Sequence, residues 1–227
     1  MEQQNSVIIV AGGKGLRMGH DLPKQFIAIG GKPVLMHTID AFYGYDNSMQ
    51  IVLVLAPDYV GYWQKLCDEY AFDIPHVITT GGETRYHSVK NGLQLATGQV
   101  IAVHDAARPF VSEELIGRCF GRIKEKKAII PAIAAVDSLR EVQNDGNSHI
   151  IDRGSIRMVQ TPQVFLADIL KEAYKTDYNP AFTDDASVVE AIGINVCLVE
   201  GEPTNIKITT PLDLEVAKLL LANKGDK

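Results

Sequence analysis

Short runs of apolar residues recur along the chain, and segments with helical spacing separate them. Six of these runs are rich in β-branched residues and nearly continuous, at 7–10, 51–55, 76–78, 100–103, 128–133 and 196–199. Continuous apolar runs, rather than alternating ones, are typical of strands in a sheet that is covered on both faces. The pattern therefore predicts a buried, mainly parallel sheet.

The segments between these strands have apolar residues at helical spacing. They predict helices over 33–42, 58–70, 85–96, 112–124, 166–175, 184–192 and 211–222. Ser112 and Asp58 stand near the start of two of them, where a side-chain oxygen can cap the first turn. Strands that alternate with helices predict a doubly wound, mainly parallel α/β fold.

The segment 136–158 departs from this alternation. It is polar and resembles a hairpin, with Asn144-Asp145-Gly146-Asn147 as its turn. Such an insertion is either a loose surface loop or an interaction arm, and the residues alone favour the loop slightly. The chain has no internal repeat and no linker that would divide it, so we expect a single domain over 1–227.

Composition and charge narrow the class of protein. Hydrophobic residues make up 46% and charged residues 22% of the chain, which is typical of globular proteins. A net charge of −6 argues against a general nucleic-acid binder, although it permits a local basic pocket for a phosphorylated substrate. We see no signal peptide and no apolar stretch of membrane-spanning length, so we expect the cytoplasm. The scattered Cys67, Cys119 and Cys197 are expected to be buried free thiols without a function.

A glycine-rich segment directly follows the first predicted strand. It reads Ala11-Gly12-Gly13-Lys14-Gly15-Leu16-Arg17-Met18-Gly19, and Pro23-Lys24-Gln25 comes shortly after. Residues without large side chains let the backbone N–H groups approach phosphate oxygens, and Arg17 and Lys24 add positive charge. The segment lacks the Gly-Lys-Ser/Thr of a P-loop, and the dinucleotide fingerprint has no place for these two cations. It therefore predicts a phosphate-binding loop of a different kind.

A second candidate site follows the predicted strand at 100–103. A carboxylate such as Asp105 at the carboxyl end of a parallel strand can hold Mg²⁺, a cation that prefers oxygen ligands. The alternative is that Asp105 only caps the turn toward Pro109. Arg108 can bind a substrate phosphate through two hydrogen bonds. We do not assign His104 as a base, because a histidine at a strand end is more often packed and hydrogen-bonded.

The pattern Ala-Gly-Gly-x-Gly-x-Arg-Met followed by Pro-Lys-Gln resembles the nucleotidyltransferases that join a nucleoside triphosphate to a sugar or polyol phosphate. Within them the chain is most similar to the 2-C-methyl-D-erythritol 4-phosphate cytidylyltransferase family. Four further motifs agree with this resemblance: Gly81-Gly82-Glu83-Thr84-Arg85 with Ser88, His104-Asp105-Ala106-Ala107-Arg108-Pro109, Thr161-Pro162-Gln163 and Asn205-Ile206-Lys207.

The resemblance implies a Rossmann-like fold with a protruding β-arm and a specific reaction. CTP and 2-C-methyl-D-erythritol 4-phosphate would give the CDP-polyol and pyrophosphate in non-mevalonate isoprenoid precursor synthesis. It also implies Mg²⁺ or another divalent cation, and a homodimer in which the arm 136–158 reaches over the partner. The expectation of an exchanged arm replaces the preference for a loose loop.

The resemblance also implies roles for individual residues. Arg85 is a weaker candidate than the rest, because an arginine in a first helical turn is often solvent-exposed. Many relatives place an arginine where this chain has Thr210, so this chain lacks one accessory positive charge at that position. The implied site is catalytic cations Arg17, Lys24 and Lys207; nucleotide-binding residues Ala11, Gly12, Gly13, Gly82 and Ser88; substrate-binding residues Arg108, Ser138, Arg153 and Thr161; and a metal ligand, Asp105.

Three other functions fit parts of the sequence. The first is a ribitol-5-phosphate cytidylyltransferase, which would share the fold and the CTP site. The second is a guanylyl- or uridylyltransferase for sugar phosphates, against which the short chain and the segment 81–88 argue. The third is a catalytically silent nucleotide-binding regulator, which would not require all of Arg17, Lys24, Asp105 and Lys207.

Overall fold

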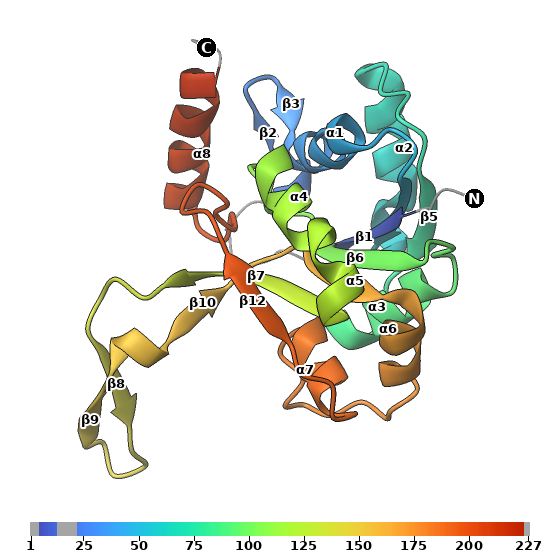
Figure 1. The fold of residues 1–227 in the computed structure, drawn as a ribbon. Coiled ribbons are helices and arrows are strands. Elements are labelled where there is room, and N and C mark those ends of the chain that lie inside the picture. Colours follow the sequence, from blue (N-terminus) through green and yellow to red (C-terminus); the bar gives the residue numbers. More distant parts are fainter. Residues whose placement is uncertain (1–4, 13–21, 225–227) are drawn as a thin grey trace.

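The computed structural model describes residues 5–12 and 22–224, and its centre is an eight-stranded sheet (Figure 1). The strands of this sheet are β1 (Asn5–Ala11), β4 (Gln50–Leu55), β5 (Val77–Thr80), β6 (Val100–Asp105), β7 (Ala128–Ala134), β10 (Arg157–Val159), β11 (Gln163–Leu166) and β12 (Cys197–Glu200). Their order is β10-β7-β11-β6-β1-β4-β5, and β12 pairs with β7. All six predicted strands are present, whereas β10 and β11 were not expected.

The sheet is mainly parallel. β1 pairs in parallel with β4 and β6, β4 with β5, and β12 with β7. β10 and β11 run antiparallel to β7, and β11 also runs antiparallel to β6. The carboxyl ends of β1, β4, β5, β6 and β7 therefore share one edge with the amino end of β11. Open α/β sheets bind ligands at this edge.

Helices cover both faces of the sheet, which confirms the doubly wound architecture (Figure 1). Helices α1, α2, α4 and α5 pack on one face, and α3, α6 and α7 on the other. None of the helices in the described part of the chain is long and apolar enough to cross a membrane. Their bounds are α1 (Val34–Tyr45), α2 (Val60–Glu69), α3 (Arg85–Leu93), α4 (Glu113–Gly121), α5 (Ile123–Lys126), α6 (Ala167–Ala173), α7 (Asp185–Glu190) and α8 (Pro211–Lys224).

Strand β1 shows why the apolar runs are continuous. Val7 and Ile9 pack with the helices of one face, while Ile8 between them packs with the helices of the other. All three side chains are fully buried. Burial of a side chain of this size stabilises the fold by about 1.5–3 kcal/mol. A polar residue at any of these positions would lose that contribution, so the run cannot alternate.

The two expected helix caps have different outcomes. Ser112 precedes α4, and its hydroxyl accepts a hydrogen bond from the Leu115 N–H at 3.0 Å, so this prediction is confirmed. The prediction for Asp58 is wrong. A 3-10 turn, η3 (Pro57–Tyr59), occupies the start of that segment, and α2 begins after it without a side-chain cap. Proline at the first position of η3 favours the tight turn, since its φ is already helical.

The segment 136–158 forms a hairpin of β8 (Leu139–Val142) and β9 (Ser148–Ile151), followed by a 3-10 turn, η4 (Arg153–Ser155). Gly146 in its turn has a φ of +83°, which favours glycine. The hairpin extends away from the sheet (Figure 1). Val142 and Ile150 are 73% and 71% exposed on it. The arm thus offers apolar surface that the rest of the described chain does not cover.

Candidate active site

Two loops meet at the carboxyl edge of the sheet. Gly12 follows β1 and Gly81 follows β5, and a Cβ built on Gly81 would lie 3.3 Å from the Gly12 Cα. A Cβ on either glycine would lie only 2.9 Å from the Ser88 Oγ. The Gly81 N–H also donates to the Leu55 carbonyl at 2.7 Å, which fixes this loop over the end of β4. Glycine is required here because the two backbones and one side chain share the same space.

Ser88 lies in the first turns of α3 and is 2% exposed. Its hydroxyl donates to the Thr84 carbonyl at 3.0 Å and accepts from the Gly82 N–H at 3.2 Å. The structure thus brings the predicted nucleotide-binding residues Gly12, Gly82 and Ser88 together. The Ser88 hydroxyl thus donates one hydrogen bond and accepts one within the protein, and the accepted bond orients the Gly82 backbone.

The remaining residues of the glycine-rich segment are only partly described. Ala11 ends β1, and its carbonyl accepts a hydrogen bond from the Gln25 amide at 3.0 Å. Gln25 belongs to a 3-10 turn, η2 (Lys24–Phe26), so this contact ties the turn that carries Lys24 to the end of β1. Gly13 and Arg17 lie outside the described residues.

Asp105, the last residue of β6, stands among three cations. The Lys207 Nζ lies 2.9 Å from one carboxylate oxygen, and the Arg108 Nε lies 3.5 Å from the same oxygen. The Arg85 Nε lies 3.6 Å from the other oxygen. Arg108 is three residues from Asp105 in the sequence, whereas Arg85 and Lys207 come from distant parts of the chain and meet Asp105 at the sheet edge. Asp105 does stabilise the turn, because its backbone carbonyl accepts a hydrogen bond from the Arg108 N–H at 3.0 Å. Its side chain, however, also contacts three cations, so capping the turn does not account for all of its contacts.

The three cations decide the charge state of Asp105. Burial by itself would raise the pKa of this carboxyl, but Arg85, Lys207 and Arg108 outweigh burial and hold the pKa well below its usual range. A nearby positive charge favours the charged form of a carboxyl group. Asp105 is therefore an anion at neutral pH and cannot donate a proton. Three cations around one carboxylate leave positive charge for an anionic ligand.

Arg85 also binds a second carboxylate, which the sequence did not indicate. Its Nη2 lies 2.6 Å from the Asp185 Oδ2, and the Tyr174 hydroxyl donates to the other oxygen of Asp185 at 2.6 Å. Burial would lower the pKa of the Arg85 guanidinium, but Asp185 and Asp105 raise it above its ordinary value. The reason for ranking Arg85 as a weaker candidate does not hold, because its side chain is partly buried and pairs with two carboxylates. The phrase Thr183-Asp184-Asp185 at the start of α7 was the available signal, yet no local pattern links it to Arg85.

Lys207 is held in place by its neighbours in the loop before α8. Ile208 is fully buried, and its N–H donates to the Ala107 carbonyl at 2.9 Å. Asn205 is also fully buried, and its carbonyl accepts from the Arg108 Nη1 at 2.8 Å. Because the residues on either side point inward, the Lys207 side chain is left to reach Asp105. The prediction that Lys207 belongs to a charged site is supported by this geometry.

Thr161 lies beside Asp105 at a cis peptide bond with Pro162. Its hydroxyl oxygen accepts a hydrogen bond from the Asp105 N–H at 3.1 Å, and its carbonyl accepts from the Asn205 side chain at 2.9 Å. Thr161 is 5% exposed. The structure therefore brings the predicted substrate residue Thr161 into the same cluster as Asp105.

Ser138 and Arg153 are not part of this cluster. Both are exposed on the arm, which points away from the sheet edge (Figure 1). The Arg153 guanidinium donates to the Val136 carbonyl at the base of the arm. Within one chain, the described structure therefore separates these two predicted substrate residues from Asp105.

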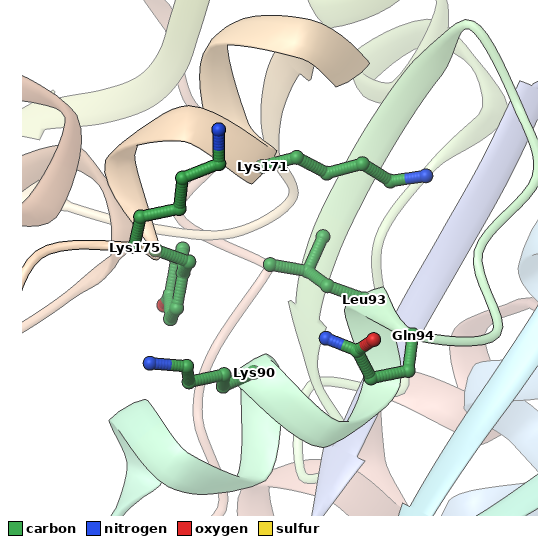
Figure 2. A pocket seen from close by; sticks show the side chains of 6 residues that line it. Lys90, Leu93, Gln94, Lys171 and Lys175 are labelled. Atoms are coloured by element: carbon green, nitrogen blue, oxygen red, sulfur yellow. The ribbon is translucent and has the colours of Figure 1, made fainter.

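A cavity of about 530 Å³ lies elsewhere, between α3 and α6 (Figure 2). One of its lysines already has a partner in the protein, since the Lys171 Nζ donates to the Ala96 carbonyl at 2.8 Å. None of the predicted site residues lines it. It is therefore separate from the cluster around Asp105. Its lining consists of Lys90, Leu93, Gln94, Lys171, Tyr174 and Lys175.

Proteins named as cytidylyltransferases are similar in sequence to almost the whole chain. A protein from Bacteroides fragilis called 2-C-methyl-D-erythritol 4-phosphate cytidylyltransferase is 57% identical over 217 residues, which is 95% of this chain and 99% of the relative. A protein of the same name from Geobacillus thermodenitrificans is 38% identical over 96% of each chain.

Solved structures show the same fold. A structure of 2-C-methyl-D-erythritol 4-phosphate cytidylyltransferase from Thermus thermophilus matches with a TM-score of 0.77 and 33% identity, over 97% of this chain and 98% of the other. A 4-diphosphocytidyl-2C-methyl-D-erythritol synthase from Anaerococcus prevotii matches with a TM-score of 0.83 and 29% identity, over 97% and 96%. The family model of IspD, 2-C-methyl-D-erythritol 4-phosphate cytidylyltransferase, matches residues 6–223. The chain therefore belongs to the IspD family of cytidylyltransferases.

Proposed function

We propose that the chain carries out its family's reaction, the transfer of a cytidylyl group from CTP to 2-C-methyl-D-erythritol 4-phosphate in the non-mevalonate route, at the cluster around Asp105. The observation that carries the proposal is the ionised Asp105 among Lys207, Arg108 and Arg85. This cluster follows β6 at the same sheet edge as the Gly12–Ser88 contact after β1. A site for two polyanions needs such an excess of fixed positive charge.

The acceptor needs no general base in this reaction. The second pKa of a phosphate monoester is about 6, so the acceptor phosphate is largely dianionic at neutral pH. One of its oxygens forms a bond to the α-phosphorus of CTP. The bond from that phosphorus to the bridging oxygen breaks, and pyrophosphate leaves with the electron pair. The low pKa of Asp105 agrees with this, because such a carboxylate does not take up a proton at neutral pH.

The protein supplies charge and position. Lys24, Lys207 and Arg17 would neutralise the charge that builds around the α-phosphorus, and Arg108 would bind the acceptor phosphate. The nucleoside would lie over the loop contact, held by Ala11, Gly12, Gly13, Gly82 and Ser88. The close approach of Gly12 and Gly81 supports this placement, because it brings the two loops together at the sheet edge.

The described residues offer a divalent cation one carboxylate ligand, that of Asp105. The described residues contain no group of three or more His, Cys, Asp or Glu side chains that could enclose a metal. Mg²⁺ usually keeps several waters and binds through one or two carboxylates plus substrate phosphates. Asp105 offers one such carboxylate, whose oxygens face Lys207 and Arg108 on one side and Arg85 on the other in the structure. We assign Asp105 as the protein ligand that would hold Mg²⁺, and the cation would supply charge that neutralises the phosphates of CTP.

The arm supports a homodimer with shared sites. Ser138 and Arg153 lie far from Asp105 of their own chain (Figure 1). They would therefore contact substrate in the acceptor site of the partner. The exposed Val142 and Ile150 give the arm the apolar surface of an interface. On this reading, segment 136–158 is a dimerisation arm within one nucleotidyltransferase domain over 1–227.

Pyrophosphate release tests the proposal directly. Purified protein with CTP and Mg²⁺ should release pyrophosphate with 2-C-methyl-D-erythritol 4-phosphate and much less with ribitol 5-phosphate. GTP and UTP should not replace CTP. Faster turnover with ribitol 5-phosphate would reassign the acceptor. Binding of CTP without turnover of either acceptor would favour a silent regulator.

A further inference from the structure

His104 is a fully buried titratable residue next to the charged cluster, and the reaction above does not use it. Its ring packs edge-on against Phe42 in α1, with ring centroids 4.9 Å apart. Both ring nitrogens have partners: Nδ1 lies 3.0 Å from the Thr161 Oγ1, and Nε2 lies 3.1 Å from the Arg108 carbonyl oxygen. The ring therefore spans from the segment before β11 to the turn after β6.

The partners fix where the hydrogens lie. The Arg108 carbonyl can only accept, so the His104 Nε2 carries a hydrogen and donates it. The Thr161 oxygen accepts from the Asp105 N–H at 3.1 Å, and its own hydrogen is then available for the His104 Nδ1. This assigns the neutral ring with the hydrogen on Nε2.

The hydrogen bonds converge on the turn that presents the charged groups. The turn is also tied to its surroundings through the Ala106 carbonyl, which accepts from the Thr38 hydroxyl at 2.9 Å, and the Ala106 N–H, which donates to the Val10 carbonyl at 3.1 Å. His104 alone among these contacts joins Thr161 to the backbone of Arg108. Loss of the ring would remove one hydrogen bond from each of these two residues at once, while Thr161 keeps its contacts with Asp105 and Asn205.

We propose that His104 is a positioning residue for acceptor binding, whose ring joins the Thr161 hydroxyl to the Arg108 carbonyl and so fixes the turn that presents Asp105 and Arg108. The inference rests on the proposed function, since it assumes that Arg108 meets the acceptor phosphate. His104 acts through these residues and does not contact substrate. The expected effect is therefore on the acceptor rather than on CTP.

Three substitutions separate the two hydrogen bonds. His104→Ala removes both. His104→Gln keeps an amide N–H near the Nε2 position and can still donate to Arg108, whereas His104→Asn keeps an acceptor near the Nδ1 position for Thr161. A net hydrogen bond is worth roughly 1 kcal/mol and an unsatisfied buried group costs somewhat more, which corresponds to about a tenfold change. We expect His104→Ala to raise the KM for the polyol phosphate about tenfold or more, with the KM for CTP within about twofold.

The conservative variants give the discriminating result. His104→Gln should recover most of the acceptor KM because it restores the link to Arg108, and His104→Asn should recover less. Equal changes in both KM values, or a loss of thermal stability with an unchanged acceptor KM, would overturn the proposal. Failure of the unmodified protein to turn over methylerythritol phosphate would instead count against the proposed function.

Long-range ¹H–¹⁵N NMR of the unmodified protein with labelled histidine tests the same inference without a variant. We expect the His104 Nε2 to carry the proton and Nδ1 to be bare at neutral pH. The opposite tautomer would overturn it. This measurement does not depend on activity or on whether the variants fold.

Discussion

The Lys207 Nζ lies 2.9 Å from the Asp105 Oδ2, and this contact joins the loop before the last helix to the end of the central strand β6. Asp105 holds the ammonium group at the sheet edge, while three cations outweigh the effect of burial and keep the carboxylate ionised. A lysine tethered in this way is pre-positioned for a phosphate, because little side-chain entropy is lost when the ligand arrives.

Replacement of Lys207 should therefore abolish most of the activity. Lys207→Met keeps much of the side-chain volume and removes the charge, and we expect kcat to fall about a hundredfold or more. Steady-state pyrophosphate release measures the effect. Lys218→Met, on the exposed side of α8, is the matched control and should retain nearly normal turnover. Comparable losses in both variants would show that charge on this side of the molecule, rather than Lys207 itself, matters.

The arm predicts complementation between two inactive chains. Lys24→Ala impairs the body of the site and Arg153→Ala impairs the arm, so a dimer of one chain of each kind has one intact site. If subunits exchange randomly, about a quarter of the normal sites are restored, and activity should rise toward that level. A mixture of Lys24→Ala with Lys207→Met is the control, since both changes affect the body and no site is repaired. No recovery in the first mixture, with exchange demonstrated by mass-tagged chains, would exclude shared sites.

The contact between Gly12 and Ser88 predicts a non-additive pair of substitutions. Gly12→Ala places a Cβ 2.9 Å from the Ser88 Oγ and should raise the KM for CTP on the order of tenfold. Ser88→Ala removes that oxygen, and the next atom, the Ser88 Cβ, lies at an ordinary 3.5 Å. The double variant should therefore bind CTP better than the product of the two single effects indicates. Strict additivity would mean that the clash is relieved elsewhere.

The pairing of Arg85 with Asp185 predicts a loss of stability. Asp185 is fully buried, and Asp185→Asn removes the charge that faces the Arg85 guanidinium. Breaking one side of a buried ion pair costs about 3 kcal/mol, so the midpoint of urea unfolding should fall clearly. Tyr174→Phe removes only the hydrogen bond to Asp185 and should cost about 1 kcal/mol. If the two variants were equally stable, the ion pair would contribute no more to the free energy of unfolding than the hydrogen bond from Tyr174 does.

The cysteines should differ in reactivity toward thiol reagents. Burial, with a smaller effect of Asp68, raises the pKa of Cys67 to about 11, and burial raises that of Cys119 to about 12. The thiolate is the reactive form, so at pH 8 both should react slowly in the native protein and rapidly after unfolding. Cys197 is half-buried and should react first. Timed labelling with Ellman's reagent and peptide mapping measures this, and fast native labelling of Cys119 would contradict it.

Most strands and helices could be predicted from the sequence, because each apolar run depends only on residues that are neighbours in the chain. Residues such as Ile8 face one layer of helices while their neighbours face the other, and that requirement leaves a continuous run in the sequence. Strand β11 was missed for the converse reason. Its run, Gln163–Leu166, begins with a polar residue that only the fold buries, and Leu166 fitted the start of the following helix.

The candidate site divides in the same way. The glycine-rich segment, Asp105, Arg108 and Lys207 stand in short motifs that follow strands, so sequence and family resemblance together could name them. Arg85 could not be judged from its surroundings, because its partner Asp185 is distant in the chain and meets it only after α3 and α7 pack on the same face of the sheet.

The sequence by itself thus determined the alternation of strands and helices and the residue types at the carboxyl edge, since both depend on neighbouring residues in the chain. The tertiary structure decided which charges meet. Only the closed fold places Lys207, Arg108 and Arg85 around Asp105 and lets their combined field keep a buried carboxylate ionised. Electrostatic energy falls with distance and burial, and neither quantity can be read from the order of residues.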